Sequence, residues 1–248
     1  MDTGVRDGAG LMRTSVDLVR HDKALLWFPA VSTFCLVVAS GFWLFEAEWI
    51  HVVNGPWPAY VLLALAGLYS LDFVAIFFNV ALVGAVNAVL DGREPSFGAG
   101  LNVAWARVGS IARWAGYSLC VSVALGFVQR FHRWIGTAAE IAWSFATFFV
   151  VPLIAFEGLT AGDARRRSFE LARLNWRAET GGLGALQAVM LVPAGMFIVA
   201  YKLLSGGRVH SHGGQALLGL VMLATFALGM AAAAVREVFA TWLYRISL

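Results

Sequence analysis

Long runs of apolar residues alternate with short charged segments from one end of this chain to the other. An α-helix rises about 1.5 Å per residue, so about 20 apolar residues cross a hydrocarbon core that is about 30 Å thick. Six runs reach or approach that length, and each predicts a membrane span. The predicted spans cover residues 24–45, residues 58 to as far as 90, and residues 114–128, 141–156, 181–201 and 213–235.

The third and fourth predicted spans are short for a full crossing, because charged residues bound them at Arg113, Glu140 and Glu157. Long charged side chains at the end of a span can reach the membrane surface, and Trp114 and Trp134 suit anchoring there. We therefore predict that both segments cross the membrane. A re-entrant hairpin is the alternative.

A related hexapeptide precedes each pair of predicted spans, in segments that predict short amphipathic helices. The copies are SVDLVR at residues 15–20, NVAWAR at residues 102–107 and SFELAR at residues 168–173. Ser96 is placed to cap the second of these helices, and Thr160 caps the third in a capping box with Asp163. The pattern suggests a threefold repeat of one helix and two spans. The units would be residues 9–90, 96–157 and 161–243 of a single transmembrane domain, 1–248.

The third of these helices carries its charges along one face. Arg166, Glu170, Arg173 and Arg177 follow one another at i, i+4, i+7 and i+11, and apolar residues share a neighbouring face. Such a helix is expected to lie along the membrane surface with its arginines toward lipid phosphates. The residues predicted to contact lipid headgroups are Arg166, Arg173, Arg177, Arg20 and Arg107.

Composition supports a membrane protein, since 60% of the residues are hydrophobic and only 13% are charged, with a mean hydropathy of +0.74. Soluble domains contain about 25% charged residues. The net charge of +3 is spread among the spans and forms no separate basic domain, so we expect membrane lipids and no nucleic acid as partners. With the N-terminus inside, 14 Lys and Arg residues fall on the cytoplasmic side and four outside, which predicts that both termini are cytoplasmic.

Asp72 is the only formally charged residue deep within a predicted span. Asn79 and Asn87 follow it, and the three residues form a polar stripe along the second span. Ionisable groups in hydrocarbon are costly and usually face a bundle interior or a cavity. The stripe is therefore a candidate path or pocket for an ion, a proton or a polar headgroup. Hydrogen bonding between helices is the alternative role.

Other candidate chemistry is sparse. Glu157 is predicted to pair with Arg165 or Arg166, and His210 and His212 lie in a loop without enough further ligands for a metal site. The chain contains no Walker loop, dinucleotide fingerprint, HExxH motif or nucleophile elbow. We therefore expect no enzymatic activity, no cofactor and no bound metal.

Three short motifs carry a resemblance to a known family. They are FFNVAL at residues 77–82, FFVVPL at residues 148–153 followed by Glu157 and Gly158, and SFELAR at residues 168–173. With them the chain resembles an uncharacterised bacterial family of six-span membrane proteins, which is distantly similar to the membrane domain of some glycerophosphodiester phosphodiesterases. The resemblance implies a fold and an inner-membrane setting. It implies no activity, because the phosphodiesterase barrel is absent and no catalytic residue can be carried over.

Together these observations predict an all-α, polytopic transmembrane bundle of six helices with three cytoplasmic interfacial amphipathic helices. The expected function is that of a non-enzymatic integral protein of the bacterial inner membrane. It would bind lipid, a membrane-protein partner or a second copy, as a scaffold or accessory subunit. The alternative is a channel or transporter for a small solute, an ion or a lipid that uses the polar stripe.

Overall fold

The computed structural model describes residues 8–52, 54–175, 195, 199, 202 and 212–247. Every regular element in these residues is a helix, as the sequence predicts. In order they are α1 (Gly8–His21), the 3-10 turn η2 (Lys23–Leu26), α2 (Trp27–Val52), α3 (Trp57–Leu90), α4 (Phe97–Ala106), α5 (Val108–Phe131), α6 (Arg133–Ala146), α7 (Val150–Glu157) and α9 (His212–Ser247). Before α9, a further helix is described over residues 161–175.

Four helical segments are long and apolar enough to cross a membrane. They are Lys23–His51, Trp57–Leu90, Val108–Phe131 and Arg133–Glu157, and they contain the first four predicted spans. The third is longer than its apolar run because α5 begins before Arg113 and continues past residue 128. The fourth includes residues before Glu140 and consists of α6 and α7, which a turn at residues 147–149 joins. The fifth predicted span lies outside the described residues except for positions 195 and 199, and the sixth lies within α9. A membrane-embedded, all-helical protein is therefore supported, while the count of six spans stays a prediction.

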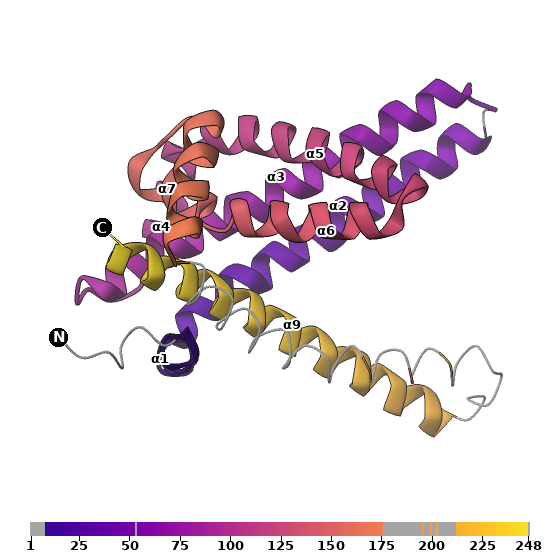
Figure 1. Cartoon of the computed structure of the whole chain (residues 1–248). Coiled ribbons are helices and arrows are strands. Elements are labelled where there is room, and N and C mark those ends of the chain that lie inside the picture. The colour runs from indigo at the N-terminus through magenta and orange to yellow at the C-terminus, as the bar shows by residue number, and fades with distance from the viewer. Residues whose placement is uncertain are drawn as a thin grey trace.

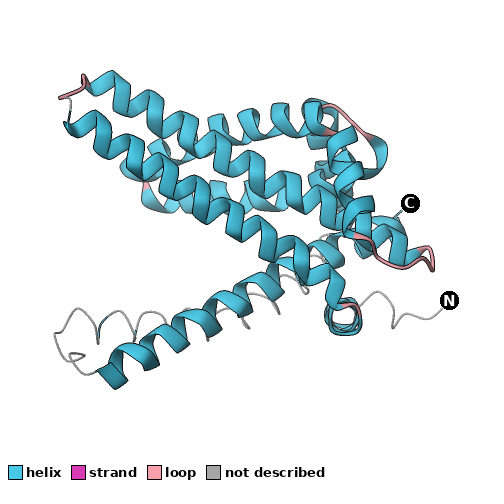
Figure 2. Ribbon diagram, turned by 180° about the vertical axis from the view of Figure 1, so that it is seen from behind, coloured by secondary structure: helices cyan, strands magenta, loops and turns pink. Residues whose placement is uncertain are grey.

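The buried residues gather at one end of the molecule, which we call the packed end. It comprises α1, η2, α4, α7, the 161–175 helix and adjoining residues 27–32, 76–90, 108–115 and 234–244. The rest of the long helices, residues 33–75 and 116–146, is largely exposed and forms the open end. Figure 1 shows α9 and the α2–α3 hairpin diverging from the packed end, and Figure 2 shows the same arrangement from behind.

α3 belongs to both ends of the molecule. Its 34 residues extend over about 51 Å, which exceeds a hydrocarbon core of about 30 Å. Only Gly67 is buried between residues 57 and 75, whereas nine of the residues from 76 to 88 are buried. The buried residues of α3 therefore gather in its second half.

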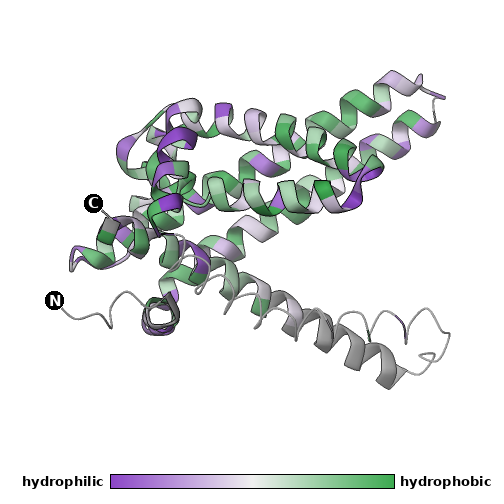
Figure 3. Cartoon of the chain, in the orientation of Figure 1, coloured by the Kyte–Doolittle hydropathy of each residue, from purple (hydrophilic) through white to green (hydrophobic). Residues whose placement is uncertain are grey.

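Hydrophobic residues line the long helices, and Figure 3 shows hydrophilic residues near the ends of helices. The short helices α4 and α7 of the packed end are apolar as well. Trp27 and Trp49 are 64% and 58% exposed near the two ends of α2. Exposed aromatic residues at both ends of an apolar helix are typical of a membrane span.

Both predicted helix caps are confirmed. The backbone N–H of Ala99 donates to Ser96 Oγ at 3.4 Å at the start of α4. At the start of the 161–175 helix, the Asp163 N–H donates to Thr160 Oγ1 at 3.4 Å, and the Thr160 hydroxyl donates to Asp163 Oδ2 at 2.7 Å. These contacts supply partners for groups at helix starts, which have none within the helix.

The hexapeptides differ in how they pack. Ser15 and Ser168, the first residues of two copies, are both fully buried. In α4 the corresponding Asn102 is exposed, and Gly100 is buried instead. The buried face of α4 is thus offset by two residues, because its small residues lie against α3. A Cβ on Gly100 would fall against the Ala81 carbonyl oxygen. The threefold repeat stays a prediction.

Candidate functional site

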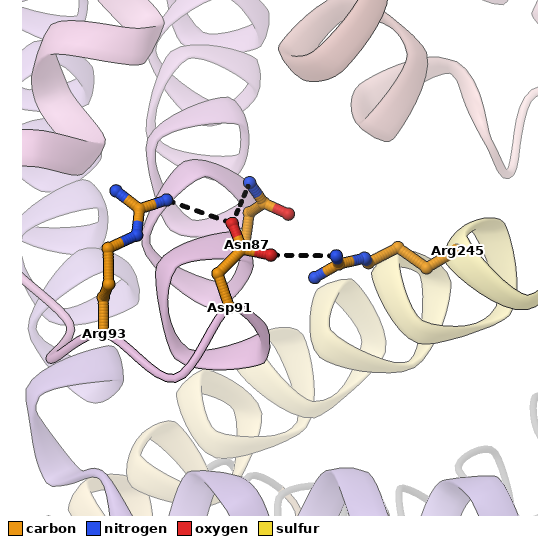
Figure 4. A network of polar contacts seen from close by, with 4 residues as sticks. All are labelled: Asn87, Asp91, Arg93 and Arg245. Carbon is orange, nitrogen blue, oxygen red and sulfur yellow. Dashed lines mark hydrogen bonds and ion pairs between the residues drawn. The ribbon is translucent and has the colours of Figure 1, made fainter.

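The end of α3 is joined to the last turn of α9 by a charged network (Figure 4). Asp91 accepts hydrogen bonds from Arg93 at 3.0 Å and from Arg245 at 2.8 Å. Asn87 donates to the same carboxylate at 3.4 Å. The hydrogen bond from Arg93 lowers the pKa of Asp91 most, and that from Arg245 lowers it further. Asn87, predicted as part of the polar stripe, thus lies in a structural network at the packed end.

The adjacent residue of α9 makes a second connection. The Tyr244 hydroxyl donates to Glu157 Oε1 at 2.6 Å, and its ring stacks on Phe156 with centroids 5.4 Å apart. Burial raises the pKa of Tyr244, and the hydrogen bond to Glu157 raises it further. Glu157 was predicted to pair with an arginine of the 161–175 helix, whereas the structure shows it bonded to Tyr244. No feature of the sequence indicated Tyr244.

Asp72 and Asn79 are partly buried on α3. Their side chains make no hydrogen bond or ion pair with any part of the chain that the structure describes. Asp72 lies 15 residues after Trp57, or about 22 Å along the helix, and four residues before Ile76, where the packed part of α3 begins. Of the three residues of the predicted stripe, Asn79 and Asn87 thus lie in the packed part of α3, and Asp72 lies outside it.

The 161–175 helix has the amphipathic character that the sequence predicts. One face is buried at the packed end through Ala164, Ser168, Leu171 and Ala172. Ser168 Oγ accepts a hydrogen bond from the Phe149 N–H at 3.1 Å. On the opposite face Arg166 and Arg173 are exposed, and so is Phe169, at 55%. Two arginines and a large apolar side chain therefore share one exposed face.

The other predicted headgroup contacts are placed differently from one another. Arg20 is exposed in the last turn of α1. Arg107 is half-buried, and its guanidinium packs against Gly158 so closely that a Cβ there would collide with Arg107 Nη1. Gly158 has a φ of +63°, a left-handed conformation that suits glycine at a helix end. Arg177 lies outside the described residues.

The sequence reasoning missed one buried carboxylate, which is paired with a partly exposed arginine. Glu237 is 3% exposed in the packed part of α9, and Arg236 Nη1 lies 3.3 Å from its Oε1. The Arg236 guanidinium carbon is 5.8 Å from the Phe148 ring centroid. In the sequence, a Glu next to an Arg just beyond an apolar run indicates an ion pair exposed to water. The carboxylate is buried only because α9 packs against the rest of the packed end. Among the described residues, no group of three or more His, Cys, Asp or Glu could hold a metal ion.

Comparison with known proteins gives one match. The model of DUF6159, a family of unknown function, matches residues 59–248, and the chain therefore belongs to this family. No curated protein and no solved structure matches the chain. The predicted resemblance to an uncharacterised family is thus supported, and similarity to the membrane domain of glycerophosphodiester phosphodiesterases stays a prediction.

Proposed function

We propose that this member of DUF6159 is a non-enzymatic integral membrane protein that acts as a scaffold or accessory subunit. Its packed end would lie at the cytoplasmic surface of the bacterial inner membrane and bind anionic lipid or a membrane partner there. The distant similarity to a phosphodiesterase membrane domain, itself a prediction, fits a membrane role without catalysis.

The exposed face of the 161–175 helix is the observation that carries this proposal. Arg166, Phe169 and Arg173 share that face, while the opposite face is fixed in the packed end. Arginines beside an exposed aromatic ring are typical of helices that lie in a membrane surface. Each cation near an anionic leaflet contributes about 1 kcal/mol of attraction. Because packing already holds this helix in place, lipid binding does not have to order it, and no conformational entropy of the helix is lost.

Lipid selectivity of the purified full-length protein tests the proposal. The protein is reconstituted in vesicles containing phosphatidylglycerol and phosphatidylcholine, re-extracted in mild detergent, and its retained lipid is identified by mass spectrometry. We expect several-fold enrichment of phosphatidylglycerol that falls at high salt, because salt screens exposed charges. Retained lipid with the composition of the vesicle would contradict lipid binding at this face. Impermeant labelling of an added terminal cysteine in oriented membranes tests the cytoplasmic placement.

A transporter is the second candidate, and Asp72 is the observation that favours it. Asp72 lies in a helix that is long and apolar enough to cross a membrane, and its carboxylate has no hydrogen bond or ion pair with the described residues. Ionisable groups inside membrane spans often mark ion or proton pathways. If Asp72 serves transport, Asp72→Asn should abolish flux into proteoliposomes while leaving the melting temperature nearly unchanged. The absence of flux for ions, protons and small solutes in the wild type would count against this function.

A further inference from the structure

Four polar side chains lie in one narrow strip along α6, a short helix of the open end. They follow one another at intervals of four, three and four residues, which keeps them within about 60° of the circumference of an α-helix. All four residues are exposed, and they are Arg133, Thr137, Glu140 and Ser144. We propose that this strip, the polar face of α6, is a docking site for a membrane-spanning helix of another protein that carries a basic residue opposite Glu140.

The packing of α6 leaves its polar face uncovered. α6 lies along α5, and Gly136 is so close to Gln129 that a Cβ on Gly136 would collide with it. Trp143, seven residues further along the same face, stacks on Trp114 of α5 with ring centroids 5.9 Å apart. Because Gly136 and Trp143 mark the side of α6 that faces α5, the polar face lies beside this contact and not within it.

Exposed apolar side chains surround Glu140 at its level along the helix pair. Ile141, the next residue of α6, is 67% exposed. Because α5 and α6 run in opposite directions, the stretch of α5 beside Glu140 includes Val123 and Phe127, which are 49% and 66% exposed. The segment Arg133–Glu157 is long and apolar enough to cross a membrane. In a membrane-embedded protein these side chains face lipid, and Glu140 faces outward among them.

Glu140 has no partner for its charge. Its carboxylate makes no hydrogen bond or ion pair within the part of the chain that the structure describes. A carboxylate that contacts lipid is costly, and such groups in membrane proteins pair with an opposite charge or face a cavity. A cation on a neighbouring helix neutralises the carboxylate. The hydroxyls of Thr137 and Ser144, one turn to either side, can hydrogen-bond across the same contact.

The charges of the polar face distinguish a different protein from a second copy. Two copies inserted with the same orientation would bring each residue of a two-fold contact close to its own counterpart. Glu140 would then face Glu140, and Arg133 would face Arg133. Like charges repel, most strongly in apolar surroundings. A helix with a basic residue at the level of Glu140 is complementary instead. The inference rests on the proposed function and deepens it, because it gives the chemistry of the membrane partner.

Binding of synthetic membrane-spanning peptides to the full-length protein tests the docking site. Each peptide has about 20 leucines, and the seventh residue from one end is Lys, Glu or Leu. The peptides carry a dansyl group, and energy transfer from the tryptophans of the protein measures their binding in phosphatidylcholine vesicles. We expect the lysine peptide to bind about tenfold more tightly than the leucine peptide, because a polar contact between membrane helices has about this effect.

Two variants and a matched control assign this preference to Glu140. Glu140→Gln keeps the size of the side chain but removes its charge, and the preference for lysine should fall to about threefold or less. Glu140→Leu should abolish it. Glu48→Gln removes the charge of another exposed residue of the open end, near the end of α2, and should leave the preference unchanged. Because both positions are exposed, the variants are expected to fold.

Three results would overturn the inference. The first is equal binding of the lysine and leucine peptides, or a preference for lysine that survives Glu140→Leu. The second is a glutamate peptide that binds as tightly as the lysine peptide, which would show that charge does not select the partner. The third is a dimer of the full-length protein that Glu140→Leu abolishes, which would make the polar face an interface between copies. Loss of phosphatidylglycerol selectivity would count against the lipid binding of the proposed function and would leave the peptide result unchanged.

Discussion

The packed and open ends are built from similar residues but are stabilised in different ways. Phe239 is fully buried at the packed end, whereas Phe34 is 69% exposed at the open end. Lipid covers an exposed apolar side chain within the hydrocarbon, so protein packing adds little there. At the packed end the apolar residues of α3 are covered by protein instead, and the short helices supply much of this cover.

The polar contacts show the same contrast. At the packed end, Glu157 and Asp91 join elements that are far apart in sequence. At the open end, the Trp43 indole N–H donates to Ser70 Oγ at 2.7 Å, between the adjacent helices α2 and α3. The packed end therefore determines the tertiary arrangement, and the open end mainly spans the membrane. Four experiments, with six substitutions in all, test this division.

The largest difference is expected from removing one aromatic ring at each end. Phe239→Ala should destabilise the protein by about 3–5 kcal/mol, because it leaves a cavity beside Phe148, whose ring centroid is 6.0 Å away. Phe34→Ala should change stability by less than about 1 kcal/mol, because lipid fills the space. Thermal unfolding in the same detergent and lipid mixture measures both. Equal losses of stability in the two variants would contradict the division between the packed and open ends.

Adding one methyl group at each end should give effects of opposite sign. A Cβ on Gly100 would meet the Phe28 ring at 2.7 Å, whereas a Cβ on Gly126 would meet nothing within 4 Å. We expect Gly100→Ala to destabilise by about 1–3 kcal/mol and Gly126→Ala to stabilise by about 0.5–1 kcal/mol through helix propensity. Chemical denaturation of the two variants beside the wild type checks the signs. A stabilising Gly100→Ala would show that α4 packs less closely than the structure indicates.

A smaller effect is expected from Tyr244→Phe, which keeps the ring on Phe156 but loses the hydrogen bond to Glu157. The free energy of unfolding should fall by about 1–2 kcal/mol near neutral pH. Because burial raises the pKa of Tyr244, its contribution is fully present below a pH of about 10, the pKa of an unfolded tyrosine. It is lost as the pH rises above that value. Melting curves should therefore show the wild type losing stability more steeply than the variant above that pH.

The smallest effect is expected from Asp91→Asn, because the network that it weakens is exposed and screened by solvent. Its arginine partners lower the pKa of Asp91, so its contribution is present above a pH of about 4 and is lost as the pH falls below that value. The melting temperature of the variant should be slightly below that of the wild type at neutral pH and low salt. Added salt or acid should remove the difference, and a difference that persists in both would indicate a packing role.

Local features of the fold could be predicted from sequence alone. The caps at Ser96 and Thr160 follow from residues within one turn of each helix start. The amphipathic 161–175 helix follows from its own periodicity. The candidate site was predicted less well: Arg166 and Arg173 lie on an exposed face as expected, but Asn87 belongs to a network in which Asp91 is bonded to Arg245, 154 positions further along the chain. No local pattern contains a contact of that separation.

The sequence by itself determined that the chain is helical, that it has apolar segments long enough to cross a membrane, and where two of its amphipathic helices begin. Those properties depend on hydrophobic length, periodicity and capping, all of which are local. Only the tertiary structure decided which apolar residues are covered by protein, that Glu237 is buried, and that Tyr244 meets Glu157. The physical reason is that lipid and a protein core are equally apolar surroundings, so the same residues suit either. Only the packing of other helices around one end of α3 shows which of its apolar residues are covered by protein.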